Sequence, residues 1–359
     1  MVSEPSELAP APSLVDDIAV DDDAVWVAYD RDERPGIQGF LVRLDRDLRP
    51  AFDPIPIGRY TSEQLRLAAL DGGVAVAWVD CDDPFCATSF ALLVQTYDRD
   101  GRPRTEPQRV ITVRESAWYL LSLAWTGETL LLWAWDWISY GLDDLVGGRL
   151  FVLDGLGRSA DGGGHIDSTG RPAATPYPFP STMRSHVSDL TRAPHGVVAV
   201  YDGPDETLWL RMLDSMGLAA GPEIQLAADF DNYPAAHSAV GDHGLVTVGW
   251  STLHLPPRSR LAVVDPMDTG VRSQIEHDNR HIALSWLENR IYMVSDCAGD
   301  RVRELCVDVY DERLRRISER TLPGVRGNAV ARNHESVLVG GLDWAGDDYA
   351  ATVRAVRCE

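Results

Sequence analysis

Lysine is absent from the sequence, so all 33 basic residues are arginines, and they face 55 acidic residues. The formal net charge is therefore −22. A GC-rich bacterial genome accounts for the lack of lysine, because charge balance bears on solubility rather than on fold. An acidic surface repels nucleic acid and anionic lipid, so neither is expected as a partner.

Long apolar stretches are also missing. No run reaches 18 apolar residues, which excludes a transmembrane helix and membrane insertion. The first ten residues have neither a basic n-region nor an apolar core, so no signal peptide is expected in the chain as given. That acidic, proline-rich start resembles the tether left after a leader is removed. The sequence thus indicates either a cytoplasmic protein or an extracytoplasmic one that is secreted, periplasmic or surface-tethered.

Helical periodicity and familiar catalytic motifs are both lacking. No stretch has a convincing 3.6-residue apolar period, which argues against helices. The patterns G-x-S-x-G and H-E-x-x-H, the Walker A loop and the EF-hand loop are absent. Enzymatic activity therefore has no direct support in the sequence, and a non-enzymatic role is favoured.

Cysteines are few, and four of the five form two local pairs. Cys81 and Cys86 flank one polar tip, Cys297 and Cys306 flank another, and both pairs fall at the same place in a repeat. This spacing predicts two disulfides and an oxidising compartment; four reduced cysteines are the alternative. Zinc is not expected, since neither pair has the C-x2-C spacing or an adjacent histidine pair. Cys358 is left over.

A short polar motif recurs along the chain and predicts a turn. Its clearest copy, residues 97–103 (Tyr-Asp-Arg-Asp-Gly-Arg-Pro), lies between two β-rich runs, and its Asp and Gly favour a hairpin turn. The first aspartate of the motif returns at intervals of 53, 56, 60, 51 and 46 residues. The six copies begin at Asp45, Asp98, Asp154, Asp214, Asp265 and Asp311.

A second recurring signature is a very apolar strand that ends in an aromatic residue and, in most copies, an aspartate. A shorter apolar strand and a tight turn precede each copy, and a further strand leads from it into the recurring Asp turn. Each unit therefore has four strands, a to d, in roughly 45 to 55 residues. The seven copies of strand b end at Asp30, Asp80, Asp136, Asp202, Ser251, Asp296 and Asp343.

Seven such units resemble the β-propeller superfamily over nearly the whole chain. The resemblance implies an all-β fold, a seven-bladed β-propeller of four-stranded antiparallel blades. The Gly-His…Trp-Asp pairing of WD40 repeats and the full sialidase Asp box are absent, so no narrower family is indicated. The seventh unit stops after strand c, and an open sheet edge needs cover. We predict that residues 1–13 close the last blade and that residues 14–359 form one propeller domain.

Three features point to the face of the ring that carries the b–c and d–a loops. The first is the set of aspartates that end strand b. Sevenfold geometry would arrange them as an acidic ring able to hold Ca²⁺ or a cationic ligand. The alternative, favoured because the feature repeats, is that each aspartate accepts N–H bonds within its own loop. The ring would comprise Asp30, Asp80, Asp136, Asp202, Asp296 and Asp343.

The second feature is a histidine trio, His186, His237 and His281, at matching starts of strand a in units four, five and six. Strand a lines the central channel of a propeller. Three converging imidazoles could bind a divalent metal ion such as Zn²⁺, Fe²⁺ or Mn²⁺ and leave positions open for substrate. The alternative is that each histidine is neutral and pairs with a nearby aspartate or carbonyl group.

The third feature is a concentration of aromatic residues around unit three. Trp118 and Tyr119 are expected to precede its strand a, and Trp137 and Tyr140 to lie beyond its strand b in a long b–c loop. Exposed Trp and Tyr beside carboxylates suit sugar stacking or a protein hot spot. The predicted ligand-binding residues are Trp118, Tyr119, Trp137, Tyr140, Asp136 and Asp202. Packing between blades is the alternative for aromatic residues here, and it is expected for Trp133.

Three hypotheses follow for function. The leading one is a non-enzymatic, extracytoplasmic binding propeller that recognises a protein or a glycan through its b–c and d–a loops. The second is a metal-dependent enzyme whose site lies in the channel near the histidine trio. The third is a structural subunit of a surface assembly. Fold alone does not decide among them, because propellers host many functions.

Overall fold

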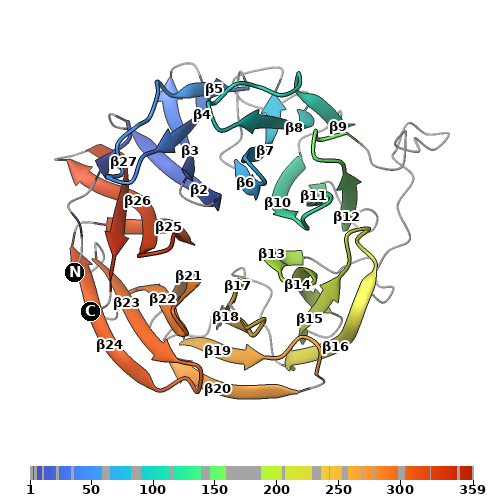
Figure 1. The fold of residues 1–359 in the computed structure, drawn as a ribbon, viewed down its shortest axis with the longest axis vertical. Helices are drawn as coiled ribbons and strands as arrows, with labels where there is room; N and C mark the ends of the chain where they lie inside the picture. The colour runs from blue at the N-terminus through green and yellow to red at the C-terminus, as the bar shows by residue number, and fades with distance from the viewer. Residues whose placement is uncertain are drawn as a thin grey trace.

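Seven β-sheets surround a central axis in the computed structural model (Figure 1). All regular structure in the described residues is β, and they contain no helix long and apolar enough to cross a membrane. The all-β, seven-bladed propeller predicted from the repeats is therefore confirmed. The structure describes residues 3, 6–9, 12–21, 24–33, 36–58, 65–81, 90–113, 117–138, 146–158, 187–203, 207–228, 236–241, 243–252, 258–268, 270–277, 280–297, 304–323, 325–345 and 348–357.

The strands of each blade follow one another along the chain, from the inner strand a to the outer strand d. Blade one holds β2 (Ser13–Asp21), β3 (Ala24–Glu33), β4 (Gly36–Leu44) and β5 (Ile55–Ile57). Blade two holds β6 (Arg66–Leu70), β7 (Gly73–Cys81), β8 (Phe90–Asp98) and β9 (Gln108–Val113). The described strands of blade three are β10 (Ala117–Trp125), β11 (Leu130–Ile138) and β12 (Val146–Leu153). Blade four holds β13 (Val187–Ala193), β14 (Gly196–Gly203), β15 (Thr207–Leu213) and β16 (Ala219–Ala227).

The second half of the ring repeats this order until its last blade. Blade five holds β17 (His237–Val240), β18 (Val246–Thr252), β19 (Arg258–Val264) and β20 (Val271–His277). Blade six holds β21 (Arg280–Leu287), β22 (Arg290–Asp296), β23 (Glu304–Asp311) and β24 (Arg316–Pro323). Blade seven holds β25 (Val325–Arg332), β26 (Val337–Ala345) and β27 (Asp348–Val356), and its outer strand is β1 (Ser6–Glu7).

Blade seven is closed by the other end of the chain. Strand β1 pairs with β27 in antiparallel register, with Ser6 opposite Val353. The Leu8 N–H donates to the carbonyl oxygen of Ala351 over 2.9 Å, which continues the ladder. The predicted ring closure by the N-terminal segment is thus present, and it leaves the β27 edge paired.

Strand b is the centre of every blade, and its large aromatic side chains fill the spaces between blades. Trp26, Trp78, Trp133 and Trp250 are all fully buried. Trp133 packs against Leu190 and Tyr201 of blade four, which confirms the predicted inter-blade role of this residue. Aromatic burial of this kind contributes most of the energy that holds neighbouring blades together.

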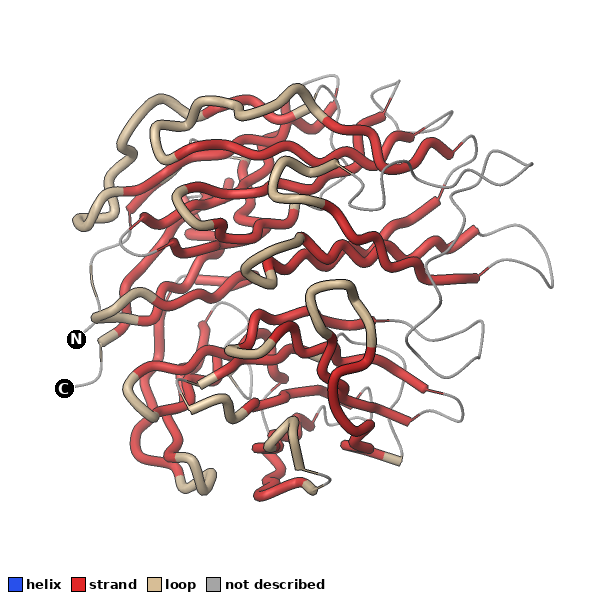
Figure 2. Tube along the Cα trace, turned by 45° about the vertical axis from the view of Figure 1, so that its right-hand side comes forward, coloured by secondary structure: helices blue, strands red, loops and turns tan. Residues whose placement is uncertain are grey.

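The recurring aspartates are the caps of the c–d turns. In each turn the carboxylate oxygen Oδ1 accepts the backbone N–H two residues further on at 2.8–3.1 Å. In five of the six turns the same oxygen also accepts the N–H four residues on, at 2.9 Å. Each aspartate therefore caps its own turn, as in an Asx turn, and the motif has a structural role. Figure 2 shows the strands stacked side by side, with described turns joining their ends.

Candidate functional site

The antiparallel order of the strands gives the ring two different faces. Strand a begins and strand b ends at one face, which we call the loop face. The a–b and c–d turns lie at the opposite face, which we call the turn face. The predicted ligand-binding residues that the structure describes, Trp118, Tyr119, Asp136, Trp137 and Asp202, lie towards the loop face, and the Asp turns belong to the turn face.

Four charged or titratable side chains of the inner strands, here named the channel cluster, come together at the centre of the ring. They are Asp17 on β2, Arg66 on β6, Asp189 on β13 and His237 on β17. Figure 1 places these four inner strands around the axis. The residues belong to blades one, two, four and five, so the cluster draws on two pairs of neighbouring blades.

Hydrogen bonds from inner-strand side chains link successive blades. Asp17 Oδ2 accepts the Leu67 N–H of blade two over 2.8 Å. Arg66 Nε donates to the Leu121 carbonyl oxygen of blade three over 3.0 Å. These side chains stand in for backbone pairing, which inner strands of different blades cannot make because they belong to different sheets.

The same linkage continues from blade three to blade five. Ser122 Oγ accepts the Leu190 N–H over 2.8 Å. Asp189 Oδ2 accepts both the N–H and the hydroxyl group of Ser238, over 2.6 and 2.9 Å. The channel cluster is therefore held in place by contacts that also hold the blades together.

Burial shifts the pKa values of two residues of the channel cluster, Asp17 and His237. It raises the pKa of Asp17 from 3.8 to about 6, although Arg66 and the Leu67 and Ile18 N–H groups act in the opposite direction. Burial also lowers the pKa of His237, against the influence of Asp189 and together with that of Arg66. Asp17 also senses Asp189, which lies in a blade that is not adjacent to its own. The charges thus act across the channel.

A carboxyl pair adjoins this cluster at the loop face. Asp16 and Asp30 share a hydrogen bond, and burial raises the pKa of Asp16 well above its usual range, with the Asp30 charge adding to the effect. Asp30 itself is buried, as is Asp202 at the matching end of strand b in blade four. Two of the described strand-b aspartates, Asp30 and Asp202, therefore have buried side chains. The predicted acidic ring as a binding site stays a prediction.

We expect the pH dependence of stability to report Asp17. Because its folded pKa lies above 3.8, the folded protein binds this proton more tightly than the unfolded chain does, so the contribution of Asp17 is most favourable below pH 3.8 and declines as pH rises towards 6. The full change corresponds to roughly 2–3 kcal/mol. Urea unfolding between pH 4 and pH 7 should therefore show wild type losing stability relative to Asp17→Asn. Parallel curves for the two proteins would contradict this assignment.

A break in strand register accompanies the cluster. Strand a shifts register against strand b between Val15 and Asp17 and, at the corresponding place in blade four, between Val187 and Asp189. Similar shifts occur in blades six and seven. Bulges re-aim side chains and are frequent next to functional sites. Sequence reasoning missed Asp17, Arg66 and Asp189, because two of the positions hold aspartate and the third holds arginine, so no residue type repeats there in every blade.

The predicted histidine trio is only partly described. His237 is the first residue of β17 and pairs with Gly249, and it lies in the channel cluster. His281 pairs with Ser295, but its side chain lies outside the described residues, as does all of His186. Within the described parts of the chain, no group of three or more His, Cys, Asp or Glu side chains could hold a metal ion. The metal site stays a prediction.

Blade three brings four of the predicted ligand-binding residues into consecutive register. Trp118 of β10 lies directly opposite Trp137 of β11, and Tyr119 lies opposite Asp136. These pairs occupy the loop-face end of the hairpin, where β10 begins and β11 ends. The expectation that Trp118, Tyr119 and Trp137 lie outside the strands is therefore wrong, because the ladder extends to the end of the hairpin. The side chains of these residues and of Asp136 lie outside the part of the structure that is described. Tyr140 lies outside the described residues. Directly opposite residues are the closest neighbours that an antiparallel pair offers.

One of the two predicted disulfides is described in full. Cys297 and Cys306 are bonded across the β22–β23 connection, with their Cα atoms 5.1 Å apart. Cys81 is also disulfide-bonded. Its predicted partner, Cys86, and the leftover Cys358 lie outside the described residues.

Comparison with known proteins supports the class but no narrower group. No family model matches the chain, and no curated sequence matches it. A chain of the mitotic checkpoint complex aligns with a TM-score of 0.55 and 12% identity, over 99% of this chain and 92% of that one. The Dos1 propeller aligns with 0.53 and 12%, over 99% and 95%. The β-propeller domain of the Trilobed protease from Pyrococcus furiosus aligns with 0.50 and 10%, over 94% and 97%. At these identities the likeness concerns the fold, and the chain is a seven-bladed β-propeller.

Proposed function

We propose that this protein is a non-enzymatic binding propeller that recognises a glycan or protein ligand at its loop face, over blade three. The single observation that carries the proposal is the register of the β10–β11 hairpin, which sets Trp118 opposite Trp137 and Tyr119 opposite Asp136. Three aromatic residues and a carboxylate thus belong to two neighbouring cross-strand pairs at one edge of the ring.

These residue types favour a glycan over a protein. Aromatic rings offer flat apolar faces for the C–H surfaces of sugars, and Tyr adds a polar tip. A carboxylate accepts hydrogen bonds from ring hydroxyl groups through two oxygens.

An extracytoplasmic location is part of the proposal. The Cys297–Cys306 disulfide supports it, because disulfides persist in oxidising compartments and are rare in the reducing cytosol. The net charge of −22 supports solubility there and discourages contact with nucleic acid or anionic lipid.

A glycan array probed with the purified full-length protein tests the proposal. We expect binding to a defined group of glycans, and at least a tenfold loss in a Trp118→Ala/Trp137→Ala double variant, since truncating a single Trp hot spot costs about 2 kcal/mol or more. Ile317→Ala is the matched control, because Ile317 is an exposed apolar residue of β24, on another blade. Equal binding by wild type and the double variant would overturn the proposal. If the protein binds no glycan but binds an extracellular protein, and the double variant loses that binding, the ligand is a protein.

A further inference from the structure

A hollow of about 290 Å³ lies at the turn face between blades four and five. The β13–β14 turn supplies Pro194 and His195, and β15 supplies Met212. Blade five adds the β17–β18 turn, which carries His243, and the β19–β20 turn, which carries Met267. We call this hollow the Met–His pocket. It lies at the end of the ring opposite the proposed ligand site, so its role does not depend on that proposal.

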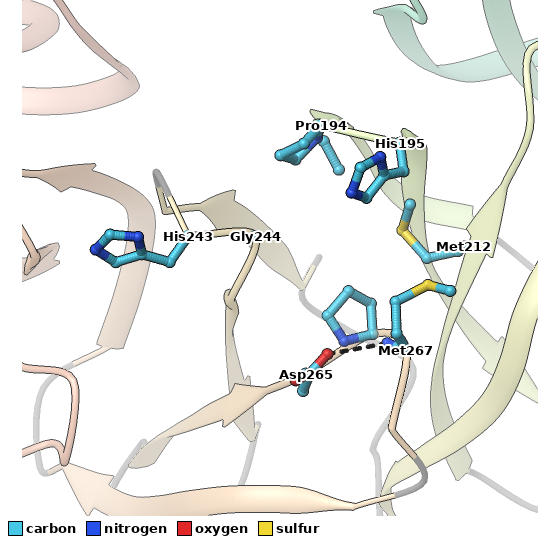
Figure 3. A pocket seen from close by; sticks show the side chains of 9 residues that line it. Pro194, His195, Met212, His243, Gly244, Asp265 and Met267 are labelled. Carbon is cyan, nitrogen blue, oxygen red and sulfur yellow. Dashed lines mark hydrogen bonds between the residues drawn. The ribbon is translucent and has the colours of Figure 1, made fainter.

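Three soft or borderline donor groups line this pocket: the His195 imidazole and the thioethers of Met212 and Met267. Figure 3 shows these three side chains, from three different segments, on the same side of the hollow, whereas the His243 ring lies on the opposite side and points away. Met212 is 2% exposed and packs in the core that blades four and five share, and Met267 is 59% exposed. One thioether is therefore fixed by packing, and the other lies at the rim.

We propose that the Met–His pocket binds a monovalent soft metal ion, Cu(I), through the thioether sulfurs of Met212 and Met267 and an imidazole nitrogen of His195. Thioethers select Cu(I), and imidazole is also a good copper ligand. Mg²⁺ and Ca²⁺ demand several oxygen ligands, which this set lacks. The strongly negative charge of the whole protein raises the local concentration of cations.

Asp265 positions the rim ligand and is not itself a ligand in this proposal. Its Oδ1 accepts the Met267 N–H over 3.1 Å, and its Oδ2 pairs with Arg272 at 2.6 Å. The carboxylate is thus engaged by the turn and by an arginine. Figure 3 shows the bond to Met267, which fixes the backbone from which the thioether extends.

A matching hollow shows that the groove comes from the fold and that its chemistry comes from the residues. About 380 Å³ lies between blades one and two at the turn face, where Arg43, Arg46 and Arg99 line the hollow together with Asp21 and Asp45. This lining contains neither a methionine nor a histidine. The donor set of the Met–His pocket is therefore specific to the junction of blades four and five.

The test is a Cu(I) titration of the full-length protein in competition with bicinchoninate, with ascorbate as reductant so that the disulfides stay intact. All proteins carry Cys358→Ser, because a free thiol would itself bind Cu(I). We expect one equivalent to bind, and at least tenfold weaker binding in Met267→Leu, Met212→Leu and His195→Ala. Leucine preserves volume, so the melting temperatures of the methionine variants should stay close to that of the parent.

Met216→Leu is the matched control. Met216 occupies the place in the blade-four turn that Met267 occupies in blade five, is 47% exposed, and does not line the pocket. Its affinity should equal that of the parent. X-ray absorption at the copper edge should report two sulfur neighbours and a nitrogen neighbour. Absence of competition with bicinchoninate, equal loss in Met216→Leu, or a copper site without sulfur would each overturn the proposal.

Discussion

Removing residues 1–11 is expected to lower the free energy of unfolding by on the order of 5 kcal/mol and the melting temperature by roughly 10 °C. The deletion removes β1 and the buried side chains of Leu8 and Ala9, which pack in the core that joins blades one and seven. It also removes the Leu8 bond to Ala351 and both hydrogen bonds between Ser3 and Ala355. The ring then ends in an unpaired β27.

The exposed edge gives this prediction a second observable. An unpaired strand edge is a template for pairing with another chain, so the shortened protein should associate in size-exclusion chromatography as its concentration rises. Two single variants in this segment distinguish the effect of losing buried apolar packing from the effect of losing an exposed charge. Leu8→Ala should cost about 2–3 kcal/mol, and Glu7→Ala, which changes an exposed side chain, should cost less than about 0.5 kcal/mol. A shortened protein that melts with the full-length protein and stays monomeric would contradict the closure model.

The ring closure could be predicted because it depends on the repeat. Seven strand-b signatures and six Asp turns define the blades, and the missing turn after β27 leaves one edge without a partner. The same periodicity predicted the inter-blade packing of Trp133 and the turn at Asp98, since both positions have counterparts in other blades. Where the fold imposes one requirement on every blade, the sequence repeats it.

The channel cluster could not be predicted on these grounds. Asp17, Arg66 and Asp189 lie at comparable places of strand a, yet one blade uses a carboxylate and the next a guanidinium group. The two aspartates accept an N–H group of the next blade, whereas Arg66 donates to a carbonyl oxygen, so the position does not hold one residue type in every blade. The register shifts before Asp17 and Asp189 could not be predicted from the sequence either. One extra residue in a strand changes neither the composition nor the apolar pattern of that strand. Only His237 of this cluster stood out, as one of three histidines at matching places.

The Met–His pocket is a further case of chemistry between blades. In the sequence, Met212 has the pattern of an ordinary apolar residue of strand c, and His195 has that of a polar residue in a tight turn. They meet Met267 because blades four and five are adjacent, although the two methionines are separated by more than fifty residues of sequence. Contacts across a blade junction are set by side-chain direction at each turn, which a single sequence does not encode in any local pattern.

The second large effect is expected for Asp308, a fully buried residue of β23. Its Oδ2 lies 3.0 Å from Nε2 of His277, which belongs to β20 of blade five, and its Oδ1 lies 2.9 Å from Nε of Arg316 on β24. One carboxylate therefore joins the outer strands of two blades. The neighbouring Tyr310 phenol has its pKa raised by burial first and then by the Asp308 charge, and its ring meets that of His277 edge-on.

We expect Asp308→Ala to reduce the free energy of unfolding by about 3–5 kcal/mol, because removing one member of a buried ion pair leaves its partners uncompensated. The lower end of this range applies, since Arg316 is 46% exposed and retains water and its pairing with Glu319. Glu319→Ala is the matched control on the same arginine. Its carboxylate is 47% exposed, so its loss should cost less than about 1 kcal/mol. Urea unfolding of the three proteins measures both values. If the two variants lose equal stability, the buried carboxylate does not join blades five and six, and the aromatic packing of strand b alone holds that junction.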